Sequence, residues 1–408
     1  MLDTPFGAPW KGYSLAERDR RWNAVRENAA QSGFDCVFVP LCVDPGNLRT
    51  SSAGAQGVRA DCRYLTLMDN AVVVLPTDGR APIIINDRGR PNEWVAEPRA
   101  AGREARGSWA KATAQALLDA GMERSRIGVS GLAGGTVTHV RAFDGVVNHS
   151  AYAEVVRALP SARFEDATDV VGFARYVKSD EEIEALRRAT AIAEAGIDTM
   201  AEVARPGVDE AELYAEVTGR MLELGSDHYH WAMNIGSFDA EGPRYTEPPI
   251  GRRLREGSFI TNEMSAIWAG MVAQEVQPIS LGALPDHWKP VVDLTLEVFE
   301  AGLQYMKPGT AFPDLIDHIA GFSRDGMHAS VGLHGRGWGN DGPLITGRAP
   351  LEKVRNLRLE RGNTWVWKPH VLSADGRIDF QWGGDVVVTE GGGEALFRRP
   401  REGVLCVR

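Results

Sequence analysis

Residues 257–279 read GSFITNEMSAIWAGMVAQEVQPI, and this stretch decides how the C-terminal part of the chain is expected to fold. Apolar side chains run along it on both sides of Trp268-Ala269-Gly270, which has the composition of a turn. If residues 268 and 269 form a tight turn, Glu263 lies directly opposite Gln274 and both side chains share one face. The stretch therefore predicts a β-hairpin with two polar groups inside an apolar run.

Around this hairpin, a unit of helix, basic residue, Pro-Gly and helix occurs twice, at Arg205-Pro-Gly207 and at Lys307-Pro-Gly309. Ser179 and Glu182 form a capping box that starts the first of these helices. The recurrence predicts a C-terminal domain of two related halves, although chance similarity of so short a pattern is the alternative. The expected helices span residues 181–203, 209–224 and 291–306, and a fourth helix is expected to begin at residue 314.

The N-terminal part alternates helices with short apolar strands, which is typical of an α/β layer. Its glycine-rich segment 131–135 lacks a GxGxxG followed by a helix, which argues against dinucleotide binding. We expect a domain boundary near residues 166–178, with domains at 1–170 and 171–408. The expected helices are 15–32 and 109–120, and the expected strands are 34–41, 71–75, 81–85 and 126–129.

Composition narrows the class of protein. The chain has 408 residues, 43% of them hydrophobic, and a net charge of −10. This length exceeds one comfortable core, and the acidic balance disfavours nucleic acid as a partner. No apolar run is long enough for a membrane span, and residues 1–15 do not resemble a signal peptide. We therefore expect no association with a membrane. Four cysteines without CxxC spacing indicate a reduced, cytoplasmic protein.

Three residues stand out as candidates for chemistry. Glu263 lies inside an apolar strand, where a carboxylate is costly to bury and its pKa is tuned, as suits a nucleophile or general base; a solvent-facing Glu is the alternative. His334 lies in the glycine-dense segment 332–339, where backbone can approach a ligand closely. Lys368 ends the apolar strand 364–367, and snorkelling to the surface is its alternative role.

Histidines and tryptophans supply candidate binding residues. His228 and His230 alternate by two residues, so a metal pair or two surface histidines on one strand face both fit. Trp338, beside His334, and Trp231 are candidate pocket walls that favour a flat or cationic ligand. If Lys368 points into the site, strand alternation instead turns Trp365 and Trp367 towards the core.

In combination, four motifs resemble the creatinase and aminopeptidase P superfamily across essentially the whole chain. They are Lys178-Ser-Asp-Glu-Glu-Ile183, the hairpin 257–279, His334-Gly-Arg-Gly337 and Val388-Thr-Glu-Gly-Gly392. The resemblance implies a creatinase-like α/β N-terminal domain at 1–170 and an α+β pita-bread catalytic domain at 171–408. It also implies a homodimer.

The chain departs from this family at the metal positions. The peptidases bind two metal ions through two Asp, one His and two Glu; His334 keeps the His, and the last Glu is missing near Gly383. Glu263 and Gln274 stand at the two Asp positions, and Lys368 replaces the Glu of Glu-Pro-Gly. This donor set predicts no metal and no other cofactor. A single metal held by Glu263, His334 and either Asp379 or Asp385 is the alternative.

Two metal-independent branches of the superfamily hydrolyse non-peptide C–N bonds. Creatinase uses a His before the hairpin, and Thr246 stands there in this chain. Ectoine hydrolase carries a nucleophilic Glu at the first metal-Asp position, where Glu263 falls. The strand around that position differs, so the same substrate does not follow.

The sequence therefore predicts a metal-independent hydrolase of a C–N bond (amide, amidine or cyclic amidine) in a small nitrogenous molecule. Glu263 attacks or activates water, His334 moves the proton, Lys368 balances charge or anchors a substrate carboxylate, and Gln274 orients Glu263 or the water. Two alternatives stay open: a metal-dependent Xaa-Pro aminopeptidase-like enzyme or lyase, and a non-enzymatic binding module. The substrate-binding candidates are Trp338, Trp231, His230 and Asp341.

Overall fold

The computed structural model describes residues 10–41, 55–101, 108–137, 145–227, 236–239, 252–346 and 351–407. The chain forms two compact units. The N-terminal unit comprises residues 11–177 and 338–343, and the C-terminal unit comprises residues 178–337 and 344–408 together with Trp10 and the residues before it. The boundary expected at residue 170 falls inside helix α6 (Thr168–Tyr176), which packs on helix α1 (Leu15–Gln31) of the N-terminal unit.

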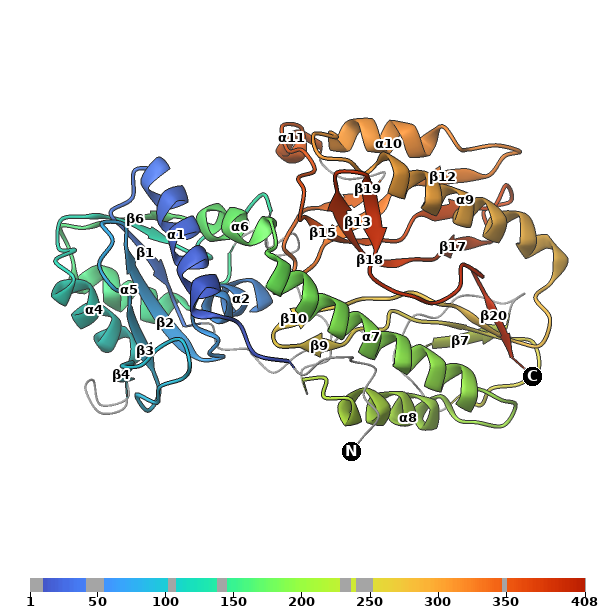
Figure 1. Cartoon of the computed structure of the whole chain (residues 1–408), viewed down its shortest axis with the longest axis horizontal. Coiled ribbons are helices and arrows are strands. Elements are labelled where there is room, and N and C mark those ends of the chain that lie inside the picture. The colour runs from blue at the N-terminus through green and yellow to red at the C-terminus, as the bar shows by residue number, and fades with distance from the viewer. Residues whose placement is uncertain are drawn as a thin grey trace. The chain divides into compact units, whose positions relative to one another are not determined.

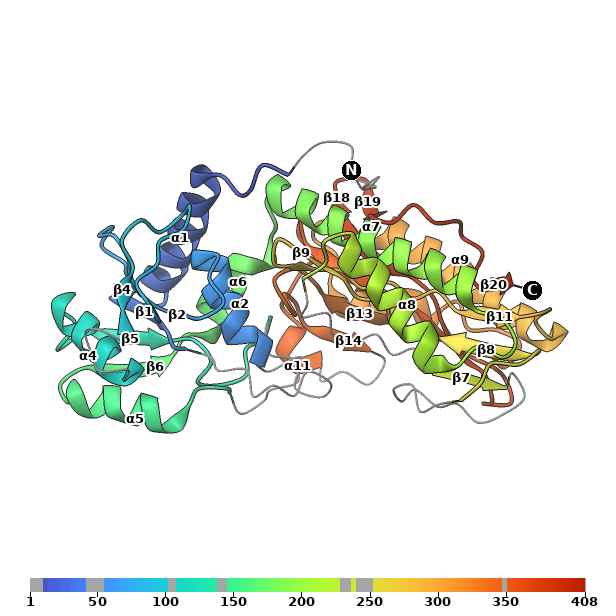
Figure 2. The ribbon, with the colours of Figure 1, turned by 90° about the horizontal axis from the view of Figure 1, so that it is seen from below.

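The N-terminal unit is a six-stranded sheet in the order β4-β3-β2-β1-β5-β6, in which β1, β5 and β6 run parallel. Helix α1 lies on one side of this sheet and helix α5 on the other (Figure 2). Side chains of β1 and β2 that face α4 and α5 are apolar and form a continuous core with them. The strands are β1 (Cys36–Val39), β2 (Ala71–Pro76), β3 (Ile83–Asn86), β4 (Arg99–Ala100), β5 (Arg126–Val129) and β6 (Arg163–Asp166), and the remaining helices are α2 (Ala55–Thr66), α4 (Trp109–Asp119) and α5 (His149–Ala158).

The C-terminal unit contains the predicted repeat of helix pairs. Helices α7 (Asp180–Val203) and α8 (Glu210–Glu223) lie side by side (Figure 1), and α9 (Lys289–Tyr305) is followed by α10 (Phe312–Ala320). Each connection turns at a glycine with positive φ, 94° at Gly207 and 89° at Gly309. The Gly207 N–H donates to Leu254 O, and the Gly309 N–H donates to Leu359 O, both at 2.8 Å. The same backbone contact in both halves confirms the repeat.

The predicted hairpin is present, but its turn lies one residue further along the chain. Ala269 and Gly270 have φ of 47° and 86°, and Trp268 pairs with Met271. Positive φ at both central residues is what a two-residue type I′ turn requires, and glycine meets that requirement at the second of them. The register predicted from a turn at 268–269 is therefore wrong.

The corrected register is the same at each point where the two arms of the hairpin pair, from Trp268 with Met271 and the Met264–Glu275 bridge to Ile260 with Ile279. It places Gln274 opposite Ser265, so Glu263 and Gln274 share a face diagonally rather than directly. The hairpin strands are β8 (Ser258–Thr261), β9 (Ile267–Trp268), β10 (Met271–Val272) and β11 (Ile279–Leu281), and β8 and β11 lie in a sheet with β7 (Gly236–Asp239) and β20 (Leu405–Val407).

A five-stranded sheet in the order β14-β13-β15-β18-β19 completes the C-terminal unit. As predicted, Trp365 and Trp367 are fully buried on its core side, where the Trp367 indole N–H donates to Phe299 O at 3.0 Å. Trp365 packs edge-on against Phe312 of α10. The strands are β13 (Gly332–Gly335), β14 (Leu344–Thr346), β15 (Thr364–Trp367), β18 (Gly384–Thr389) and β19 (Gly392–Ala395), and the other elements of this unit are η1 (Asp286–Trp288), β12 (His328–Ser330), α11 (Leu351–Val354), β16 (His370–Leu372) and β17 (Asp379–Gln381).

Within the part of the chain that is described, no helix is both long and apolar enough to cross a bilayer.

Candidate functional site

One face of the five-stranded sheet, here called the polar sheet face, carries His334 and Asp385. His334 on β13 pairs with Val366 on β15, and Val366 pairs with Asp385 on β18. Residues directly opposite each other, and residues two apart on one strand, point to the same side of a sheet. His334 and Asp385 therefore share the face opposite to Trp365 and Trp367. His334 is 9% exposed and Asp385 is fully buried, so this face is largely shielded from water.

Glu263 and Lys368 form an ion pair between the hairpin and the end of β15. Their side chains are 24% and 12% exposed, so the pair is partly shielded from water. Shielding strengthens the attraction between the two charges, and each charge compensates for the other's lost hydration. The structure thus brings together two residues that the sequence had nominated separately, 105 positions apart.

Gln274 is held at both its side chain and its backbone. The Arg336 guanidinium donates to Gln274 Oε1, and the Gln274 backbone N–H donates to Asp385 Oδ2 at 3.0 Å. Arg336 follows β13 directly and is 1% exposed. This arrangement orients the Gln274 amide and places a second buried cation beside the hairpin. Sequence reasoning had not assigned a role to Arg336, although it stands two residues after His334.

Two further carboxylates, those of Asp385 and Glu275, are fully buried next to Gln274. Burial raises the pKa of Asp385 to about 7, although Arg336 and hydrogen bonds from Gln274 and Thr190 oppose the shift. Burial also raises the pKa of Glu275 well above its ordinary value; Arg399 opposes this, and neighbouring Asp385 adds to it.

Arg399 holds this buried cluster together. It forms an ion pair with Glu275 and donates to Gly383 O at 2.7 Å and to Gln277 Oε1 at 3.2 Å. Its guanidinium also lies 4.0 Å from the centre of the Phe397 ring. Sequence reasoning missed Glu275 and Arg399, because only the folded chain brings together residues 124 positions apart.

Trp338 and Asp341 belong to the N-terminal unit, where both are buried. The Trp338 ring packs against Tyr13 and lies 4.7 Å from the Arg21 guanidinium. Asp341 forms an ion pair with fully buried Arg175 and accepts a hydrogen bond from the Trp338 backbone N–H at 2.8 Å. These contacts stabilise the 338–343 segment, and substrate binding by either residue stays a prediction.

His230 and Trp231, the other predicted substrate-binding residues, lie outside the described residues, as do His228 and Thr246. Their proposed roles also stay predictions.

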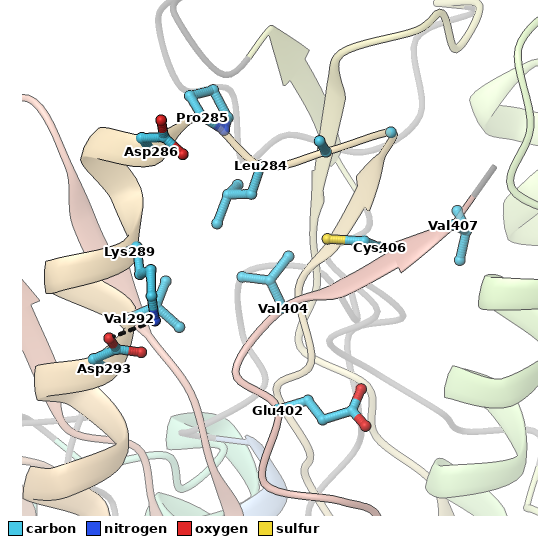
Figure 3. Close-up of a pocket in the computed structure, with 12 residues that line it drawn as sticks. Leu284, Pro285, Asp286, Lys289, Val292, Asp293, Glu402, Val404, Cys406 and Val407 are labelled. Carbon is cyan, nitrogen blue, oxygen red and sulfur yellow. Dashed lines mark hydrogen bonds and ion pairs between the residues drawn. The ribbon is translucent and has the colours of Figure 1, made fainter.

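A pocket of about 550 Å³ opens elsewhere in the C-terminal unit, between the start of α9 and strand β20 (Figure 3). Its lining includes Asp286, Glu402 and Cys406, and Lys289 is bound to Asp293 at its edge at 2.8 Å. None of the described candidate residues lines this pocket, so it is separate from the polar sheet face.

Comparison with known proteins identifies the family to which the C-terminal part of the chain is similar. A model described as metallopeptidase family M24 matches residues 184–390. An uncharacterized hydrolase/peptidase of Sinorhizobium fredii is 30% identical over 273 residues, which are 61% of this chain and 63% of that protein. Ectoine hydrolase of Halomonas elongata is 27% identical over 277 residues, 62% of this chain and 65% of that protein. The matched region thus spans less than two thirds of either relative.

Solved structures share the fold over almost the whole chain. The X-Pro aminopeptidase of Thermotoga maritima superposes with a TM-score of 0.72 at 18% identity, covering 95% of this chain and 99% of that one. The Xaa-Pro dipeptidase of Bacillus anthracis gives a TM-score of 0.72 at 18% identity, covering 96% and 100%. The predicted fold class, an α/β N-terminal part with a pita-bread C-terminal part, is confirmed.

The residues at the expected metal positions do not fit a pair of divalent cations. Such cations are held by several carboxylate oxygens and imidazole nitrogens. Here the Glu263 carboxylate binds the Lys368 ammonium, and the Gln274 amide oxygen binds the Arg336 guanidinium. Within the described ranges, no three His, Cys, Asp or Glu side chains gather as a ligand set. The positive charge at these positions comes from protein side chains.

Proposed function

The chain belongs to metallopeptidase family M24, and we propose that it is a hydrolase that cleaves a C–N bond in a small nitrogenous molecule. We further propose that, unlike a metallopeptidase, it does so without a metal ion. The observation that carries the proposal is the ion pair between Glu263 and Lys368, with Arg336 bound to Gln274 beside it. A carboxylate nucleophile and protein cations are the parts that metal-free acyl transfer needs. The likeness to ectoine hydrolase supports this chemistry.

Each residue then has a defined task. A Glu263 oxygen attacks the amide or amidine carbon, and the C–N bond breaks as the leaving nitrogen takes a proton from His334. Lys368 and Arg336 stabilise the negative charge that develops on the attacked group. Water then cleaves the bond between Glu263 and the substrate carbon, which regenerates the carboxylate. In the alternative form, Glu263 removes a proton from the water that attacks the substrate directly.

The test compares the wild-type chain with Glu263→Gln on three compounds. Ectoine is a cyclic amidine, N-acetylglycine is an open amide, and Ala-Pro is an Xaa-Pro dipeptide. Each is assayed for the amine it releases, with and without EDTA. We expect ectoine or N-acetylglycine to be cleaved equally well in EDTA, and Glu263→Gln to lose activity at least about 10³-fold, because an amide is a poor nucleophile.

A matched control is Glu256→Gln, which removes an exposed carboxylate just before the hairpin and should leave the rate unchanged. Cleavage of Ala-Pro that disappears in EDTA would instead favour the metal-dependent peptidase, which the solved structural neighbours suggest. No cleavage of any compound by the wild-type chain would favour the binding module. The homodimer and the cytoplasmic location stay predictions from the family resemblance.

A further inference from the structure

A second imidazole, which sequence reasoning did not consider, lies beside the polar sheet face on the three-stranded sheet β12-β16-β17. His370 begins β16, two residues after Lys368, and its Nδ1 lies 3.2 Å from Asp379 Oδ1 on β17. A carboxylate at Nδ1 favours the tautomer with the proton on that nitrogen and leaves Nε2 free to accept one. This is the arrangement that fixes and activates a general base in hydrolases.

The position of Gly332 shows where Nε2 points. A methyl group in place of the Gly332 hydrogen would lie 2.8 Å from His370 Cδ2 and 3.1 Å from Nε2. Gly332 and His334 are two residues apart on β13, so substituents on both point to one face. The Lys368 N–H donates to Gly332 O at 2.8 Å. His370 Nε2 therefore lies on the face of His334, beside the strand end that carries Lys368.

Exposure increases along this face towards His370. The side chain of Lys368 is 12% exposed, that of His370 is 34% exposed and that of Asp379 is 50% exposed. Bulk water thus reaches His370 more readily than it reaches the Glu263–Lys368 pair. His370 is also more exposed than His334, which is 9% exposed, so His370 is the better placed of these two to receive water and to exchange protons with solvent.

We infer that His370, oriented by Asp379, is the general base of the second half-reaction, in which water cleaves the bond between Glu263 and the substrate carbon. This inference rests on the proposed function, with Glu263 as the nucleophile. After the C–N bond has broken, the substrate carbon is bonded to a Glu263 oxygen. The amine of an open amide has then left, whereas the amine of a cyclic amidine stays attached through the second nitrogen. Nε2 takes a proton from a water molecule, and the water oxygen forms a bond to that carbon. The bond from the carbon to Glu263 breaks, its electron pair returns to the carboxylate, and His370 passes the proton to solvent.

The experiment separates the two half-reactions in the full chain, with ectoine and N-acetylglycine as the probes. Amine release is followed by rapid quench, and the intact protein is weighed by mass spectrometry. We expect His370→Asn to free one equivalent of amine rapidly and then to turn over about 10²-fold or more slowly. The ratio kcat/KM should change little, because it reports the first half-reaction, so KM should fall together with kcat. The mass of this variant should increase by the group bound to Glu263. Asp379→Asn should show a smaller loss, and imidazole should partly rescue His370→Gly.

His328→Asn is the matched control, because His328 is an exposed histidine on the neighbouring strand β12 and should keep the wild-type rate. The inference is overturned if His370→Asn turns over like wild type, or shows no burst and no added mass, while Glu263→Gln is inactive. If Glu263→Gln is as active as wild type, or wild type cleaves neither probe, the proposed function fails and this inference fails with it.

Discussion

The buried carboxyl group of Asp385 should make the free energy of unfolding depend on pH, and this dependence can be measured. It is fully buried, and its Oδ2 accepts hydrogen bonds from the Gln274 backbone N–H and the Thr190 hydroxyl, both at 3.0 Å. Its Oδ1 has no hydrogen-bond partner among the described residues. A buried carboxyl group with one unsatisfied oxygen is more stable protonated than charged.

The pH dependence follows from the raised pKa. The pKa of Asp385 rises from 3.8 to about 7 on folding. Between about pH 4 and pH 7 the folded chain therefore holds a proton that the unfolded chain has already lost. The contribution of Asp385 to stability is fully present below pH 3.8 and is lost as the pH rises towards 7. Three pKa units correspond to about 4 kcal/mol.

Asp385→Asn removes this titration with little change in shape, because an amide oxygen can still accept from Gln274 and Thr190. The free energy of unfolding is measured by urea denaturation of both full-length proteins at several pH values from 4 to 7. Relative to the variant, the wild type should lose about 3 kcal/mol of stability across this range, because the unfolded Asp385 is already partly ionised at pH 4 and the folded one is only half ionised at pH 7. Parallel curves for the two proteins would refute the reasoning.

Two further predictions concern buried contacts in each unit. Arg175→Met should lower the free energy of unfolding by about 3–5 kcal/mol, because it leaves Asp61 and Asp341 buried without their cation; a loss below about 1 kcal/mol in urea denaturation contradicts this. Gly384→Ala should cost about 1–3 kcal/mol or more, because its methyl group would lie 1.9 Å from Glu275 Oε2. Gly219→Ala, in open space on α8, is the control and should stabilise by about 0.5–1 kcal/mol in the same assay, so equal effects of the two alanines would exclude the clash.

Local features were predictable because they depend on neighbouring residues. The capping box at Ser179 and Glu182 forms as expected, since a helix start is specified within one turn. Alternation along 364–368 correctly turned Trp365 and Trp367 to the core, because successive strand residues face opposite sides. The hairpin was foreseen, but its register was missed by one turn position, since the residues that tolerate positive φ set the register.

The sequence by itself thus determined several of the helices and strands, the two related halves and the choice of Glu263, Gln274, His334 and Lys368 as polar candidates. Only the tertiary structure decided which partners these residues have. Pairing of Glu263 with Lys368 joins residues 105 positions apart, and pairing of Glu275 with Arg399 joins residues 124 positions apart. Such pairs depend on how separate strands align and pack, and periodicity within one strand carries no information about that alignment.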